Sequence, residues 1–130
     1  MLAKPKKYKN PIPALRRKAD KLYQKLHVKN NKYCLICSSK TDCIHHFFTK
    51  ASSSSLRYEE DNGIPICQRC HCKLHRRQDP SMIAIILRKK GKGWYERLDQ
   101  KRLTPIKTNV NYYRSIIEHL EGEILNEEIQ

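Results

Sequence analysis

The sequence contains no long hydrophobic run. Its longest aliphatic stretch, Met82 to Leu87, is far shorter than the roughly 20 apolar residues that cross a bilayer. No charged start followed by an apolar segment resembles a signal peptide. We therefore expect a cytoplasmic protein that has no membrane partner.

The chain also lacks the length for a large core and shows no internal repeat of 20–50 residues. Its 130 residues fit one domain with appendages. The cysteine-containing segment, about residues 34–77, is too short to bury much apolar surface of its own. A structural metal would stabilise such a segment, because zinc binding to cysteine-rich sites contributes roughly 10–16 kcal/mol to folding.

Acidic residues are scarce in most of the chain, which has 27 Lys and Arg, 13 Asp and Glu, and a formal net charge of +14. Residues 1–33 hold eleven bases and one acid, and residues 76–107 hold ten bases and three acids. Residues 34–75 are nearly neutral, with five bases and four acids, whereas residues 108–130 hold one base and five acids. Two basic regions around a neutral centre favour nucleic acid as the partner. A basic surface that serves only solubility is the alternative.

The hydrophobic pattern predicts an α+β fold with helices at both ends. Residues 1–13 carry four lysines and three prolines, which predicts a flexible basic arm. Apolar residues at helical spacing predict an amphipathic helix from Ala14 and an acidic amphipathic helix within residues 108–130. We expect residues 14–107 to form the central domain. Within it, Asp79-Pro80 predicts a helix start, and Trp94 to Leu98 a further helical turn.

A strand, a short return strand and a helix are predicted in the cysteine-containing segment. Thr41 to Phe48 is rich in β-formers, Ile64-Pro65-Ile66 can form a short edge strand, and a helix can follow from about Gln68. Strand alternation places Cys43 and His45 on one face, and Ile44 and His46 on the other. Adjacent histidines on a strand are therefore not expected to point into the same pocket.

Four of the six cysteines occur in two Cys-x-x-Cys pairs, Cys34/Cys37 and Cys67/Cys70. Paired thiolates at this spacing favour a closed tetrahedral zinc site, and in a reducing cytosol they indicate metal ligands before disulfides. Cys43 and Cys72 lie outside the pairs. We interpret both as packed side chains, and leave open a role for Cys43 in a metal site.

Four of the six histidines fall within residues 45–75 as two close pairs, His45/His46 and His71/His75. His71 and His75 are four residues apart on the predicted helix and can join His45 as imidazole ligands, leaving positions open for water or phosphate oxygen. His46, with an ordinary pKa near ~6.5, can take a proton from water. Ordinary surface or core histidines are the alternative.

The motif order CLIC, CIHHFF, Asn62 and CQRCHCKLH resembles the HNH endonuclease family, whose fold is the ββα-metal fold. The resemblance implies a small HNH core held together by a structural zinc and a DNA endonuclease that hydrolyses phosphodiesters to a 5′-phosphate and a 3′-hydroxyl. It makes His45, His71 and His75 the ligands of a catalytic metal and His46 the general base. It also makes Asn62 the brace of the loop that orients His46.

A second resemblance covers RRKADKLYQKLHVKNNKYCLIC, LRYEEDN and the helical tail, which are similar to the Rap/NinG group of lambdoid phage recombination nucleases. It implies branched or recombination DNA as the substrate and a bacterial or phage-infected cell. Cys-His stands here where that group has Cys-Asn. The histidine-rich site leaves Mg²⁺, Mn²⁺, Ni²⁺ and Zn²⁺ all open as the catalytic metal.

Six basic residues near the motifs are candidate phosphate contacts: Arg57, Arg69, Arg76, Arg77, Lys18 and Lys21. A solvated basic face is the alternative reading for them. Two other classes of function also fit the sequence. One is a zinc-containing nucleic-acid-binding module without catalysis. The other is an interaction protein whose C-terminal helix docks a partner or forms a homodimer.

Overall fold

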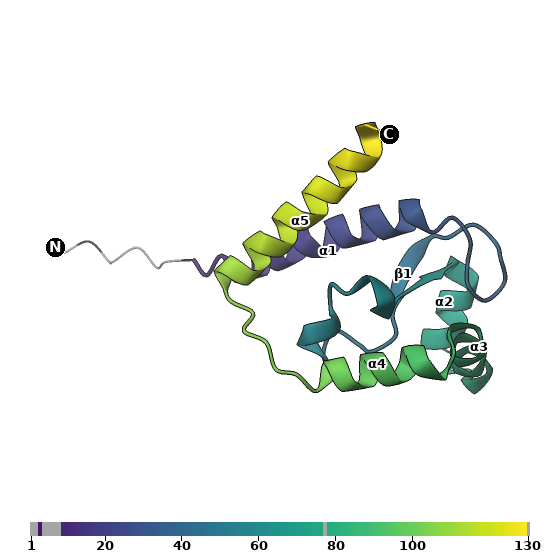
Figure 1. Cartoon of the computed structure of the whole chain (residues 1–130). Coiled ribbons are helices and arrows are strands. Elements are labelled where there is room, and N and C mark those ends of the chain that lie inside the picture. The colour runs from purple at the N-terminus through teal and green to yellow at the C-terminus, as the bar shows by residue number, and fades with distance from the viewer. Residues whose placement is uncertain (1–2, 4–8, 77, 130) are drawn as a thin grey trace.

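A computed structural model describes residues 3, 9–76 and 78–129. This part of the chain is α+β, with five α-helices and one two-stranded antiparallel sheet (Figure 1). The elements are, in chain order, α1 (Ile12–Asn30), β1 (Cys43–His46), the short 3-10 helices η1 (Ser54–Leu56) and η2 (Glu60–Asn62), β2 (Gly63–Ile66), α2 (Gln68–His75), α3 (Pro80–Lys90), α4 (Lys92–Arg102) and α5 (Val110–Ile129). None of the described helices is both long and apolar enough to span a membrane.

The first helix begins at Ile12, two residues before the predicted start at Ala14. Proline is tolerated in the first turn of a helix because that turn needs no intrahelical N–H donor, so Pro13 does not delay the start. The amide of Ile12 instead bonds the side chain of Asn10 (3.0 Å). The prediction of a flexible arm is therefore wrong for residues 12 and 13, which are helical. Residues 1–2 and 4–8 of the predicted arm lie outside the described residues.

The predicted start of α3 is confirmed, because the Asp79 side chain accepts a hydrogen bond from the Ser81 amide (3.0 Å). The helix ends at Lys90, and the capping residue that follows, Gly91, has a φ of 90°, which glycine adopts without strain. A new helix starts at the next residue, so the single turn predicted at Trp94 to Leu98 is part of the longer α4. The Trp94 indole is buried and donates to the Asp61 carbonyl (2.8 Å).

β1 is shorter than the predicted strand Thr41 to Phe48, whereas β2 begins one residue before the predicted Ile64-Pro65-Ile66. The two strands pair over four residues, with Ile44 opposite Pro65 and His45 opposite Ile64. The amide and carbonyl of Ile44 both bond the side chain of Gln24 on α1, at 2.8 and 2.9 Å. These backbone groups therefore point away from β2. Pro65, which has no N–H, therefore lies opposite a residue that requires no hydrogen-bond donor from β2.

Both faces of the hairpin are buried, against different helices. Ile44 packs in a core between α1 and α5 with Tyr23, Leu26, Leu120 and Ile124. On the opposite face, Ile64 packs with Leu56, Ile86, Trp94 and Leu98. Ile66 packs with Cys34, Cys67 and Cys70. The hairpin consequently lies between the α1–α5 pair and the α3–α4 pair, as Figure 1 shows.

Gly63 offers a test of this packing. A Cβ atom on Gly63 would lie 2.5 Å from the Tyr23 hydroxyl and 2.7 Å from Cγ2 of Ile44. We expect Gly63→Ala to lower the free energy of unfolding by about 1–3 kcal/mol, because the core must shift to admit a methyl group. Gly122→Ala, in an exposed part of α5 with open space around it, should raise that free energy by about 0.5–1 kcal/mol. Urea denaturation of the two variants measures both values, and a Gly63→Ala protein as stable as wild type would refute the close contact.

Candidate functional site

The first candidate metal site is a group of four sulfur atoms that lie within 4.8 Å of one another, from Cys34, Cys37, Cys67 and Cys70. The first two come from a turn closed by a hydrogen bond from the Cys34 amide to the Ser39 carbonyl (2.6 Å). The other two lie at the start of α2, where the Cys67 sulfur caps the helix by accepting from the Cys70 amide (3.5 Å). The fold thus brings together the two motifs, which are far apart in sequence.

The chemistry of these donors fits a structural metal such as zinc. Hydrogen bonds with Ser39 lower the pKa of the Cys37 thiol to about 6. Burial instead raises the pKa of the Cys70 thiol. A divalent cation would stabilise the thiolate forms of such closely spaced sulfurs, which is the arrangement of closed zinc sites.

The remaining two cysteines lie outside the four-sulfur group. Cys43 is partly buried against the core around Ile66 and has its sulfur 3.5 Å from Nδ1 of His71. The Cys72 sulfur accepts a hydrogen bond from the Gln68 side chain (3.6 Å). Cys43 therefore borders the second candidate site.

That second site contains three histidines, His45 from β1 and His71 and His75 from α2, whose ring nitrogens lie within 4.8 Å of one another. The centroid of the His75 ring lies 4.9 Å from that of His45 and 4.4 Å from that of His71. The one-turn spacing on α2 puts His71 and His75 on the same helix face, and the strand alternation of β1 turns His45 toward them. Three imidazoles at this spacing could hold a metal and leave coordination positions open.

The surroundings favour the neutral form that metals require for two of these imidazoles, His45 and His71. Burial, together with the charges of His75 and His71, lowers the pKa of His45 to about 4. Burial also lowers the pKa of His71. Neutral rings at physiological pH need lose no proton before they bind a cation.

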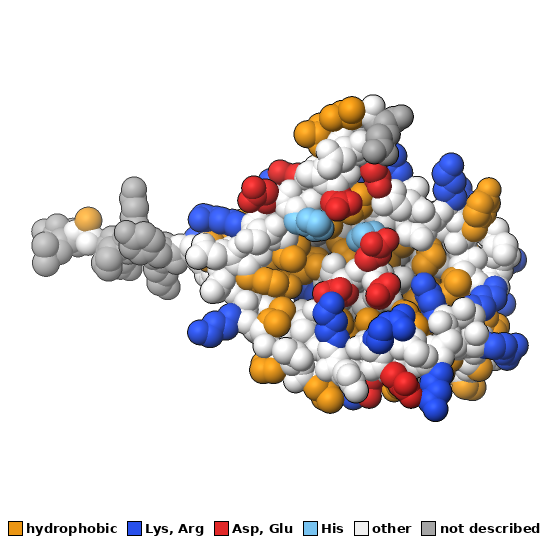
Figure 2. All heavy atoms as spheres, viewed as in Figure 1, with side chains coloured by type: hydrophobic (Ala, Val, Ile, Leu, Met, Phe, Trp, Pro, Cys, Tyr) orange, Lys and Arg blue, Asp and Glu red, His pale blue; other side chains and the backbone are white. Residues whose placement is uncertain are grey.

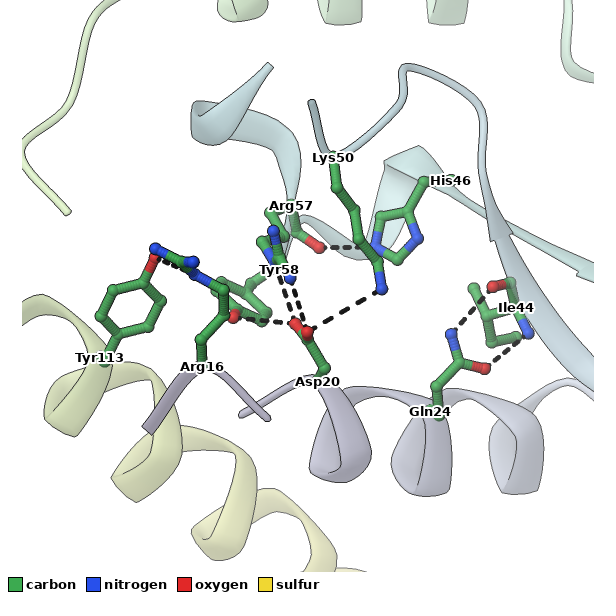
Figure 3. Close-up of polar contacts among 9 residues, drawn as sticks. All are labelled: Arg16, Asp20, Gln24, Ile44, His46, Lys50, Arg57, Tyr58 and Tyr113. Atoms are coloured by element: carbon green, nitrogen blue, oxygen red, sulfur yellow. Dashed lines mark hydrogen bonds and ion pairs between the residues drawn. The ribbon is translucent and has the colours of Figure 1, made fainter. Parts of the chain in front are cut away.

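His46 makes contacts different from those of its neighbour. Its ring stacks on Tyr23, with centroids 5.1 Å apart. Its Nε2 lies 2.8 Å from the Arg57 carbonyl oxygen, as Figure 3 shows. Because a carbonyl can only accept, Nε2 carries the proton of the neutral ring and Nδ1 is left as a proton acceptor. Burial lowers the pKa of His46, so the neutral ring persists at physiological pH.

All four of these histidines line one pocket of about 440 Å³, together with Gln24 and Lys50. The expectation that His45 and His46 face different pockets is therefore wrong. β1 pairs on one side only, and the pocket extends around its unpaired edge so that side chains from both faces reach it. The sequence shows the alternation of a strand but not that the strand lies at an edge.

Asn62 is fully buried and joins the end of β1 to the loop that carries Arg57. Its Oδ1 accepts from the Phe48 amide (2.9 Å), while its Nδ2 donates to the carbonyls of Phe48 (3.0 Å) and Leu56 (3.2 Å). Arg57 follows Leu56 directly and supplies the carbonyl that holds His46. Asn62 thus fixes the separation between the strand and the loop on which the orientation of His46 depends.

Sequence reasoning missed Asp20, which fixes the same loop from α1. Its carboxylate binds Nε and Nη2 of Arg57 at 2.9 and 2.6 Å and accepts from the Tyr58 hydroxyl at 2.9 Å (Figure 3). Burial raises the pKa of Asp20, but the hydrogen bonds from Arg57 and Tyr58 outweigh this effect and lower it. One signal was available, because Asp20 is the single acid among the eleven bases of residues 1–33.

The candidate phosphate contacts lie in different environments. The Arg57 guanidinium is bound by Asp20, and Lys18 pairs with Glu121 of α5 (3.1 Å). Arg77 lies outside the described residues. Three others are exposed: Lys21, Arg69 and Arg76. On the face seen in Figure 2, acidic side chains gather along α5 and near the centre, and Lys and Arg lie mainly around the rim.

Replacing a cysteine inside the four-sulfur group and one outside it should have different effects on zinc content. We expect Cys70→Ser to lose the tightly bound zinc, about one ion per chain, because a closed site needs all four thiolates. Cys72→Ser on the same helix should retain that zinc. Elemental analysis after dialysis against a weak chelator measures both. Equal zinc in the two variants would show that the four-sulfur group is not the structural site.

The chain matches no family model, no curated protein and no solved structure.

Proposed function

We propose that this protein is a metal-dependent DNA endonuclease of the HNH type, which hydrolyses phosphodiester bonds. One observation carries the proposal: three convergent histidines and a fourth with an unprotonated ring nitrogen line the same pocket. A metal site and a base at the same pocket are what phosphodiester hydrolysis requires. The order β1, β2, α2 agrees with a ββα-metal core, and the basic regions agree with DNA as the substrate.

His45, His71 and His75 would hold the catalytic metal. Bound there, a divalent ion would act as a Lewis acid toward the phosphate and its leaving oxygen. Among the residues that the structure describes, no carboxylate lines the pocket. Because imidazole suits zinc and nickel better than magnesium, we expect Zn²⁺ or Ni²⁺ to bind more tightly than Mg²⁺.

His46 is the general base of the proposed reaction. Its Nδ1 takes a proton from a water molecule, whose oxygen forms a bond to phosphorus while the bond to the 3′-oxygen breaks. The products are a 5′-phosphate and a 3′-hydroxyl, the leaving oxygen taking its proton from solvent. The Arg57 carbonyl and the Tyr23 ring keep Nδ1 of His46 in position by fixing the tautomer and the plane of the imidazole.

The four-cysteine site has a structural role in this proposal. It links the turn after α1 to the first turn of α2, and α2 carries His71 and His75. A zinc held by the cysteines would fix this helix relative to β1, which carries His45. The four cysteines would therefore, with such a metal bound, set the distances within the histidine site without touching the substrate.

Replacing His46 tests the catalytic role. We expect His46→Ala to slow DNA cleavage by about 10²–10⁴-fold, the usual contribution of a general base. His119→Ala should cut like wild type, because His119 is exposed on α5 and lies away from the pocket. Nicking of plasmid and cleavage of a four-way junction, with Zn²⁺, Ni²⁺, Mn²⁺ or Mg²⁺ added, measure the rates.

The substrate series also tests the branched-DNA preference, for which faster cleavage of the junction than of linear duplex is expected. A wild-type protein that binds DNA but cuts no substrate with any metal would instead support the non-catalytic binding module. A His46→Ala protein that cuts as fast as wild type would remove His46 from the mechanism.

A further inference from the structure

A second pocket, of about 240 Å³, adjoins the histidine pocket and lies between the start of α1, the loops around β1 and the start of α5. Its cationic lining consists of Arg16, Lys50 and Arg57, and its aromatic lining of Tyr112 and Tyr113. We propose that this pocket binds a backbone phosphate of the substrate strand, next to the phosphate that is cleaved. The inference rests on the proposed function and extends it to how the strand is held.

The lining of the pocket suits an anion. Seven described side chains line it, one serine and one threonine among them; all seven carry an N–H or O–H donor, and none of these seven is a carboxylate. Arg16 Nε donates to the Tyr113 hydroxyl oxygen (3.1 Å), so the hydroxyl proton remains available to a ligand (Figure 3). The volume is about eight times the ~30 Å³ that a water molecule occupies in the liquid, which leaves room for a phosphate group.

The charge balance around the pocket also favours an anion. Asp20 is the described acid that pairs with two of its cations, Arg57 and Lys50, and its carboxylate takes two donors of Arg57 and the Tyr58 hydroxyl. Lys50 lies farther from the same carboxylate, at 3.9 Å. The pocket thus has three cations, and the one described carboxylate paired with them is already bound by Arg57, which leaves a surplus of positive charge on Arg16 and Lys50.

Two residues connect this pocket to the histidine pocket. Lys50 lines both. Arg57 lines the second pocket through its side chain, while its carbonyl holds His46 in the first. Neighbouring phosphates on a nucleic-acid strand are joined through a single sugar, so they can occupy two pockets that adjoin each other. A strand that passes Lys50 can therefore place one phosphate beside the histidines and its neighbour beside Arg16.

Arg16→Gln tests the phosphate site, with Arg17→Gln as the charge-matched control. Arg17 is exposed on the same helix and does not line the pocket. Both changes are made in a zinc-loaded His46→Ala protein so that the oligonucleotide probe is not cut. Fluorescence anisotropy with a labelled single-stranded oligonucleotide, over a series of salt concentrations, gives the affinity and its salt dependence.

We expect Arg16→Gln to weaken binding roughly tenfold relative to Arg17→Gln and to reduce the slope of log K against log salt by about one, as for a lost phosphate contact. Lys50→Gln should do the same, which keeps the test valid if Arg16→Gln alters the fold. Inorganic phosphate should compete only at concentrations far above the oligonucleotide. Equal affinities and slopes in the Arg16 and Arg17 variants would overturn the site, and Arg16-dependent phosphate binding as tight as oligonucleotide binding would make it a free-phosphate site.

Failure of this inference is distinguishable from failure of the nuclease proposal. In the cleavage-competent protein, Arg16→Gln should raise KM and leave kcat nearly unchanged, because Arg16 contacts the strand and not the reacting atoms. If wild type cuts but the binding slopes of the two arginine variants agree, the phosphate site is wrong and the nuclease stands. If wild type does not cut, the nuclease proposal fails whatever the slopes show.

Discussion

The antiparallel pairing of Cys43–His46 with Gly63–Ile66 is the constraint on which both candidate sites depend. A two-stranded hairpin is at best marginally stable in water, so this one requires partners on both faces. Ile44 buries one face against α1 and α5, and Ile64 and Ile66 bury the other. Because a shift of one residue would exchange the faces, burial on both sides also fixes the register and hence the directions of His45 and His46.

The polar contacts around the hairpin fix its edge and its ends. Gln24 bonds the free edge at Ile44, and Asn62 ties the end of β1 to the following loop. Asp20 then binds Arg57, whose carbonyl meets His46. In the proposed enzyme, α1 thus contributes to catalysis without contributing a reacting group, since it positions the loop that orients the base. Mutually bonded groups that are buried, as Asn62 is, or partly buried, as Asp20 and Arg57 are, are costly to break singly, which restricts the movement of the loop.

Local sequence patterns predicted the parts of the site that lie close together in the chain. The Cys-x-x-Cys spacing, the helical spacing of His71 and His75, and the Asp79-Pro80 start of α3 each depend on neighbouring residues. The pocket that His45 and His46 share could not be predicted from the sequence, because no local pattern shows that β1 is an edge strand. Contacts such as Asp20 with Arg57, separated by 37 residues, depend on how α1 docks, which hydrophobic periodicity does not specify.

The view that the histidines form a metal site of their own, separate from the cysteines, can be tested by anomalous diffraction from crystals grown with saturating zinc. We expect two anomalous peaks in each chain, one among the sulfurs of Cys34, Cys37, Cys67 and Cys70, and one among the ring nitrogens of His45, His71 and His75. A peak at the cysteines with none at the histidines would show that the histidine cluster does not bind this metal. Nickel should then be tried in the same crystals, and its absence from the histidines as well would refute the two-site view.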